Sequence, residues 1–201
     1  MSVLIEFLFT ICSILLIPVV IVLLLFLGWT IVLFGGFLRE CLMRSAVRKH
    51  LDHCLAAAKQ GEDRTKLWEI MQQARSGVLA AFYARTGPEM SHAEVLSHAV
   101  VELEHSITES MARLSLLTRV GPMLGLMGTL IPLGPALRGL ASGDMQMMAQ
   151  NLVVAFTTTI IGVLVGSMAY GMGLVRRVWY GRDLCDLEFI GRRLGGNGGP
   201  S

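Results

Sequence analysis

The sequence predicts an all-α integral membrane protein with three transmembrane helices and a helical cytoplasmic domain between the first and the second. Three observations lead to this prediction: long stretches without charge, basic residues gathered between them, and helical periodicity in the charged part of the chain. Hydrophobic residues make up 53% and charged residues only 16% of the 201 residues. A soluble domain usually carries about 25% charge, so an ordinary soluble fold is excluded.

The uncharged stretches define the spans. They run from Phe7 to Leu38, from Val120 to Leu137 and from Met145 to Val175. A helix needs roughly 20 apolar residues to cross the hydrocarbon core, with about 17 as the minimum. All three stretches qualify, and they predict the spans within residues 1–38, 120–137 and 148–175.

The basic residues predict the orientation. Of 17 Lys and Arg residues, eleven lie between Arg39 and Arg119, five lie between Arg176 and Arg193, and only Arg138 lies between the second and third spans. Basic loops stay cytoplasmic. We therefore expect a multi-pass protein of the inner (cytoplasmic) membrane, with the N-terminus outside and the C-terminus in the cytoplasm. Residues 39–119 are then cytoplasmic, and residues 138–147 form a short external loop.

The cytoplasmic domain, residues 39–119, is divided into three helical segments by Gly61 and by Gly87–Pro88. The middle segment carries apolar residues at helical spacing, which predicts one helix with a buried side. Those residues are Leu67, Ile70, Met71, Ala74, Val78 and Phe82.

The last cytoplasmic segment opens with Ser91 and Glu94, the spacing of a capping box at a helix start. No helix breaker separates it from Val120, so we expect one helix to continue into the second span. The third span similarly continues as a cytoplasmic C-terminal helix over residues 176–194. Residues 195–201, rich in glycine, are expected to form a flexible tail.

Small residues form a stripe along one side of each of the last two spans. Such residues let helix backbones approach closely, and Gly162 and Gly166 have the GxxxG spacing of tight helix crossings. Helix packing alone accounts for most glycines of this kind. The stripes are Gly121, Gly125, Gly128, Thr129, Pro132, Ala136 and Gly139 in the second span, and Asn151, Ala155, Thr158, Thr159, Gly162, Gly166, Ala169 and Gly173 in the third.

Thr129 and Thr159 are expected at similar depth, near the bilayer midplane, because the helices rise about 1.5 Å per residue. A lone membrane threonine often bonds back to the carbonyl one turn earlier. Two hydroxyls at one level also suit a polar spot that donates to a carboxylate or coordinates an ion.

No Asp, Glu, His, Lys or Arg lies within the three spans. Intramembrane ionisable residues mark proton and ion pathways. If this protein moves ions, a partner must therefore supply the carboxylate.

Other chemistries find little support. The four cysteines show no CxxC spacing, and we expect no disulfide, no metal and no cofactor. Glu102 and His105 have the E-x-x-H spacing of di-metal bundles, but they fit a solvated helix face better. The net charge of +2 is too small to indicate nucleic-acid binding, and no nucleophile–base pair or phosphate loop indicates an enzyme.

Two segments resemble those of the MotA/TolQ/ExbB proton-channel family. Pro122-Met-Leu-Gly-Leu-Met-Gly-Thr129 resembles the P-x-L-G-L-x-G-T segment of that family. Ala155-Phe-Thr-Thr-Thr159-Ile-Ile-Gly162 resembles its A-L-x-x-T-x-x-G segment in the last span. The resemblance covers residues 110–180 by motif and the whole chain by topology, and three spans resemble the TolQ/ExbB branch.

The resemblance implies a stator-type subunit of an ion-driven membrane motor. It implies a homo-oligomer, a pentamer, around a single-span TolR/ExbD/MotB-like partner that carries a membrane aspartate. The missing intramembrane acid then has a source. The resemblance places the ion pathway at Thr129, Thr158 and Thr159, and it assigns packing around the partner helix to Pro122, Gly125, Gly128, Asn151, Ala155, Gly162 and Gly166.

Two departures from the family pattern leave the ion open. Val154 stands where the relatives often carry a glutamate, and Met168 where they often carry a proline. Thr157 and Thr158 add hydroxyls that suit sodium coordination, so both proton and sodium stay as alternatives. The energised process, such as transport or motility, is also open. A non-conducting oligomeric membrane scaffold is the alternative function.

Overall fold

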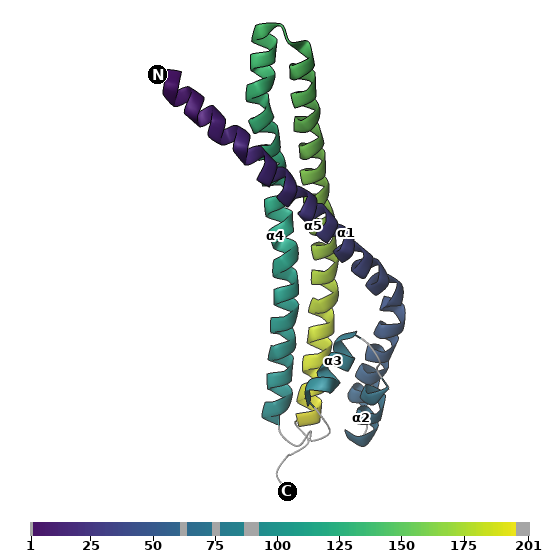
Figure 1. The fold of residues 1–201 in the computed structure, drawn as a ribbon. Helices are drawn as coiled ribbons and strands as arrows, with labels where there is room; N and C mark the ends of the chain where they lie inside the picture. Colours follow the sequence, from purple (N-terminus) through teal and green to yellow (C-terminus); the bar gives the residue numbers. More distant parts are fainter. Residues whose placement is uncertain (1, 61–63, 74–76, 87–92, 196–201) are drawn as a thin grey trace. The chain divides into compact units, whose positions relative to one another are not determined.

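The computed structural model describes residues 2–60, 64–73, 77–86 and 93–195 of the chain (Figure 1). Within these residues all regular structure is helical, which confirms the predicted all-α class. The helices are α1 (Ser2–Gln60), α2 (Arg64–Gln72), α3 (Gly77–Thr86), α4 (Ala93–Ser142) and α5 (Met145–Gly195).

Three of the helices are long and apolar enough to cross a membrane. Their candidate membrane-spanning segments are Ser13–Arg44 in α1, Leu96–Ser142 in α4 and Met145–Arg192 in α5. The prediction of three transmembrane helices is thereby confirmed. Both α4 and α5 run without interruption beyond the predicted spans, as expected from the lack of helix breakers.

The short helices differ from the expectation. Helices α1 and α3 end at Gln60 and Thr86, next to the breaks predicted at Gly61 and Gly87, but residues 67–82 are not one helix. Gly77 has a φ of +87°, a left-handed conformation that interrupts an α-helix and that glycine adopts without steric cost. Ala74, the Ser91 cap and the side chain of Glu94 lie outside the described residues.

The chain forms two compact units, which we describe separately. The first unit comprises Met1–Gly36 and Arg113–Gly173, and the second comprises Phe37–Ala112 and Leu174–Ser201. The three long helices each contribute a segment to both units.

The second unit has a hydrophobic core to which all five helices contribute. Its members are almost fully buried, and burying one large aliphatic or aromatic side chain contributes about 1.5–3 kcal/mol. Leu67, Met71, Val78 and Phe82 of the predicted stripe all belong to it, although they come from two helices rather than one. The other members are Leu51, Cys54, Ala58, Leu79, Leu96, Ala99, Leu103, Leu187 and Ile190.

A buried ion cluster joins α1 to α5 in this unit. The Asp183 side chain is only 2% exposed and accepts two hydrogen bonds from Arg44, at 2.7 and 2.8 Å. Arg48 Nη1 donates a third, at 3.0 Å. Arg48 also contacts Asp52 and Asp186, each at 2.9 Å, although the Asp186 contact does not have hydrogen-bond geometry. Paired guanidinium–carboxylate contacts of this kind are strong and directional.

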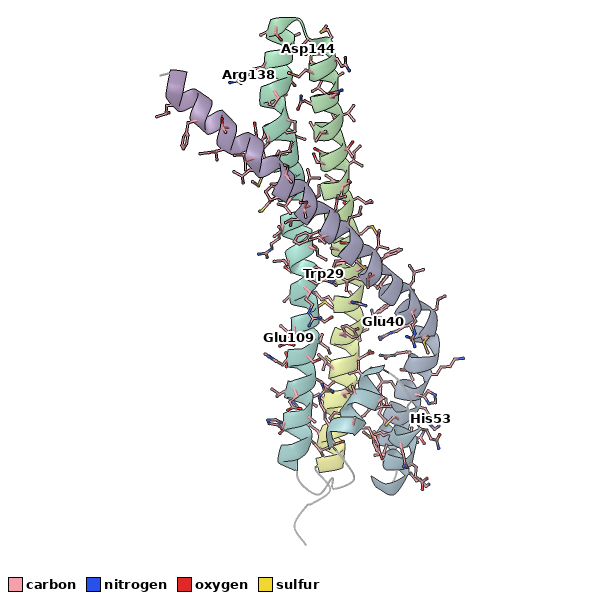
Figure 2. The ribbon with its side chains drawn as sticks, viewed as in Figure 1. Trp29, Glu40, His53, Glu109, Arg138 and Asp144 are labelled. Atoms are coloured by element: carbon pink, nitrogen blue, oxygen red, sulfur yellow. The ribbon has the colours of Figure 1, made fainter. Side chains whose placement is uncertain are left out.

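A second cluster lies beside the first. Glu40, labelled in Figure 2, accepts hydrogen bonds from Arg176 Nε at 2.9 Å and from the Tyr180 hydroxyl at 2.6 Å. The Phe37 and Trp179 rings stack with centroids 5.8 Å apart, and the Arg44 guanidinium lies 5.0 Å from the Trp179 ring centroid. The two clusters fix the pairing of α1 with α5 within the second unit.

In the first unit, α4 and α5 form an antiparallel hairpin (Figure 1). Gly143, with a φ of +78°, ends α4, and the Asp144 N–H donates to the Gly139 carbonyl at 2.8 Å. The Asp144 carboxylate caps α5 by accepting the Met147 N–H at 2.9 Å. The link predicted at residues 138–147 is therefore helical apart from Gly143 and Asp144.

The first part of α1 buries only a narrow edge in this unit. Val19 is 5% exposed and Leu23 1% exposed, whereas Leu25 and Val32 are more than half exposed. Because the hairpin is the only other element of the unit, α1 must pack against it through Val19 and Leu23. The rest of its surface is an apolar face suited to lipid.

Candidate functional site

Glycines let α4 and α5 approach closely along the hairpin. A Cβ added at Gly162 would lie 2.7 Å from the Gly121 carbonyl oxygen and 2.7 Å from Gly125 Cα. A Cβ at Gly166 would lie 2.6 Å from the Pro122 ring. Both distances are below van der Waals contact, so these positions tolerate no side chain without separation of the helices. We call these residues the glycine seam: Gly121, Gly125 and Gly128 of α4 with Gly162 and Gly166 of α5.

The predicted small-residue stripes therefore pack against each other within one chain. Gly125, Gly128, Ala155, Gly162 and Gly166 are all buried in this single chain. The four glycines contact the facing helix of the hairpin, whereas the sequence predicts packing around a partner helix for all five residues. That assignment remains a prediction for the assembled protein.

The remaining predicted packing residues lie at the edges of the seam. The Pro122 ring is exposed on one side and faces Gly166 on the other. Asn151, about two turns beyond the hairpin turn, is half-buried and donates from Nδ2 to the Met147 carbonyl at 2.8 Å. Neither residue contributes a free charge.

Thr158 belongs to the seam. It is 4% exposed, and a Cβ at Gly128 would lie 2.6 Å from its Cβ and hydroxyl oxygen. Its hydroxyl donates within α5, to the Val154 and Ala155 carbonyls at 3.0 and 2.9 Å. In this single chain the Thr158 side chain therefore packs in the seam, and its role in an ion pathway, like those of Thr129 and Thr159, stays a prediction.

The two flanks of the seam differ in exposure. With successive residues about 100° apart around a helix, Leu117, Val165 and Met172 fall on one flank and all are buried. Leu126 and Val163 fall on the other flank and are 59% and 52% exposed. We infer that α1 covers the first flank, since it is the remaining element of this unit. The second we call the open flank.

Thr129 and Thr159 both lie on the open flank, and both are half-buried. The seam places Gly125 opposite Gly162 and Gly128 opposite Thr158. Thr129 is then level with Thr157, which precedes Thr159 by two residues. Thr129 and Thr159 are therefore offset from each other by about 3 Å along the helix axis. The hairpin thus brings the two threonines of the predicted pathway to one face at nearly one depth.

Their hydrogen bonds define what these hydroxyls can do. Thr129 Oγ1 donates to the Leu126 carbonyl at 2.7 Å, and Thr159 Oγ1 donates to the Ala155 carbonyl at 3.2 Å. A hydroxyl has one proton and two acceptor lone pairs. With the proton engaged, the lone pairs are available to accept from a protonated carboxyl group or to coordinate a cation.

The three consecutive threonines of α5 do not converge on one point. Thr157 is exposed and donates to the Val153 carbonyl at 2.8 Å, Thr158 lies in the seam, and Thr159 lies on the open flank. Successive helical side chains point about 100° apart. The proton and sodium alternatives both stay predictions.

Among the residues that the structure describes, no group of three or more His, Cys, Asp or Glu side chains is placed to hold a metal ion. The ionisable clusters around Asp183 and Glu40 belong to the second unit. The sequence does not predict these clusters, because the residues that they join are more than 130 positions apart in the chain.

The sequence model of the MotA/TolQ/ExbB proton channel family matches residues 42–174, about two thirds of the chain. The match includes both threonine-bearing segments and the whole glycine seam. The chain belongs to the MotA/TolQ/ExbB family. No curated protein and no solved structure matches it significantly.

Membership has direct consequences. MotA/TolQ/ExbB proteins are proton-channel subunits of stator type, not enzymes, and the predicted function of this chain is confirmed at that level. They are multi-pass proteins of the inner membrane, in agreement with the three apolar helices. The family generally works as an oligomer with a partner of the TolR/ExbD/MotB type.

Proposed function

We propose that this protein is the stator-type subunit of an ion-driven motor of the three-span TolQ/ExbB branch. Several copies, five by the family pattern, surround a single-span partner whose membrane aspartate carries the ion. The N-terminus lies outside, and the second unit lies in the cytoplasm. Ion flow past the open flank then drives an envelope process such as transport or motility.

The open flank of the α4–α5 hairpin is the observation that supports this proposal most. It presents the Thr129 and Thr159 hydroxyls at nearly one level, with acceptor lone pairs available. The spans contain no acid of their own, so these hydroxyls need a carboxylate from another chain. A protonated aspartate can donate to Thr129 or Thr159, and a deprotonated one can receive a cation that they coordinate.

Replacement of Thr159 by valine tests the proposal, because valine keeps the shape and removes the hydroxyl. We expect proton or sodium flux through vesicles that contain the chain and its partner to fall at least about tenfold, the effect of losing roughly 1.4 kcal/mol of stabilisation. Thr157→Val is the matched control, since Thr157 donates the same kind of bond but lies off the open flank. Flux should be unchanged in that variant.

Equal flux in the parent and in Thr159→Val would exclude a role for this hydroxyl. Absence of flux in the parent with its partner, together with an intact oligomer, would favour the non-conducting scaffold instead. Imposing a pH gradient and a sodium gradient separately identifies the coupled ion.

A further inference from the structure

The second unit carries two exposed faces of opposite charge. The outer face of α1 carries more basic than acidic groups: Lys49 and His53 lie at its centre with exposed basic residues on either side, and its exposed carboxylate, Asp52, is paired with Arg48. The outer face of α4 carries Glu102 and Glu109 beside an exposed Val101, together with the exposed His98 and His105, and has more acidic than basic groups. The flanking residues are Arg39, His50 and Lys59 on α1 and Glu104 on α4.

The charged groups on these faces form few close ion pairs within the chain. Lys49 and Glu104 form no ion pair within the described residues. Within the described residues Glu109 forms an ion pair with His105 at 3.6 Å, and Glu102 forms ion pairs with Arg85 at 3.6 Å and His98 at 3.8 Å. These contacts exceed hydrogen-bond distance, so the carboxylates retain their capacity to accept strong bonds.

The two faces point away from each other. The opposite sides of the same helices, including Leu51 and Cys54 of α1 and Ala99 and Leu103 of α4, are buried in one common core. The outer faces must therefore lie on different sides of the unit. Figure 2 shows this directly, with Glu109 on the outer side of α4 and His53 on the outer side of α1.

Because the two faces carry opposite charge and lie on different sides of the unit, they favour a head-to-tail contact between copies over a two-fold contact. A two-fold contact would bring basic face to basic face or acidic face to acidic face, and like charges repel. A head-to-tail contact pairs opposite charges and leaves a free acidic and a free basic face for the next copies. Such a contact closes into a ring when the rotation between copies permits it.

We propose that the acidic α4 face of one copy docks on the basic α1 face of the next, and that this contact closes the subunit ring. The occupant of each face is thus a second copy of this chain. Glu109 and Glu102 pair with Lys49 and His53 of the neighbouring copy, and Val101 packs against the apolar stem of a lysine at the centre. This inference rests on the oligomer in the proposed function and specifies its interface.

Cysteine crosslinking in the full-length protein tests the contact. In a background in which Cys12, Cys41, Cys54 and Cys185 are replaced by alanine, His105→Cys and Lys49→Cys are combined in one chain. A short bismaleimide should yield a ladder of linked copies that ends at the closed ring. Either single-cysteine variant should yield no more than traces, because like faces do not meet.

Charge exchange provides an independent measurement. Lys49→Glu and Glu109→Lys should each lower the assembly's apparent association constant at least about tenfold at low salt, and the double exchange should restore most of the loss. Glu69→Lys on α2, also an exposed carboxylate, is the matched control and should have no effect.

Each result supports or overturns the inference. A ladder from the cysteine pair and rescue by the double exchange support it. If the unsubstituted protein is an oligomer but the cysteine pair yields no ladder, this interface is overturned and the proposed function is unaffected. Efficient linking of Lys49→Cys alone overturns it in favour of a like-to-like contact. If the unsubstituted protein is a monomer, both the interface and the proposed oligomer are overturned.

Discussion

At the scale of single residues, the position of a hydroxyl on its helix decides its use. Thr157, Thr158 and Thr159 have the same chemistry and all donate to carbonyls of α5. They differ in surroundings: one is exposed, one lies in the glycine seam, and one lies on the open flank. Because successive side chains point about 100° apart around the helix, Thr158 packs in the seam while the adjacent Thr159 is a candidate ion ligand.

The glycine seam gives a prediction at this scale. Gly162→Ala should destabilise the hairpin by about 1–3 kcal/mol, the usual cost of an extra methyl group in a packed interface, because its Cβ would approach backbone atoms of α4. Gly171→Ala is the control on the same helix, since a Cβ there has no neighbour within 4 Å. Detergent-denaturation midpoints measure both. A loss no larger at Gly162 than at Gly171 would contradict the close approach.

Cys54 gives a second prediction. It is fully buried in the core of the second unit, and burial raises the pKa of its thiol to about 11. A raised pKa means less reactive thiolate at pH 8. Iodoacetamide should therefore modify the exposed Cys41 and Cys185 in the folded protein and spare Cys54 until the protein unfolds. Mass spectrometry of the labelled peptides measures this, and rapid labelling of Cys54 in the folded state would contradict its burial.

At the scale of elements, two kinds of contact hold the long helices together. The hairpin in the first unit depends on small residues and backbone approach, because apolar side chains gain nothing from leaving lipid. In the second unit α1 and α5 are joined by buried ions around Asp183 and Glu40. Water lies outside that unit in the proposed topology, so a hydrophobic core and charge pairing can both stabilise it.

The ion cluster makes a prediction for α1 and α5. Asp183→Asn should destabilise the second unit by about 3–5 kcal/mol, because it leaves the guanidinium groups of Arg44 and Arg48 without their shared buried partner. Glu188→Gln is the control, since it removes an exposed ion pair with Arg192 that is worth at most about 1 kcal/mol. Chemical denaturation of both variants measures the difference. Similar midpoints would show that the cluster contributes specificity rather than stability.

At the scale of the whole molecule, the chain lacks one component of an ion pathway. Its spans contain hydroxyls but no Asp, Glu, His, Lys or Arg side chain. Vesicles that contain this chain alone should therefore show no proton or sodium flux above empty vesicles, and flux should appear with a single-span partner that carries a membrane aspartate. Replacement of that aspartate by asparagine is the control and should abolish the flux. Conduction by the chain alone would refute the requirement for a partner.

Much of the fold could be predicted because its signals are local. Spans need about 20 apolar residues and basic residues flank them, so composition alone located the three long helices. The break inside residues 67–82 was missed because the apolar spacing of Leu67, Met71, Val78 and Phe82 suits one helix or two. Only the φ of Gly77 separates these possibilities, and tertiary packing sets that angle.

The sequence by itself determined that this protein has three membrane helices, small-residue stripes on the last two, a threonine within each stripe and no intramembrane Asp or Glu. These properties follow from residue order and the period of a helix. The tertiary structure alone decided that the glycines close the hairpin, that Thr158 turns inward while Thr129 and Thr159 remain on the open flank, and that Asp183 joins α5 to α1. Those outcomes depend on which helix faces approach each other, and contacts between residues far apart in the chain leave no periodic signal.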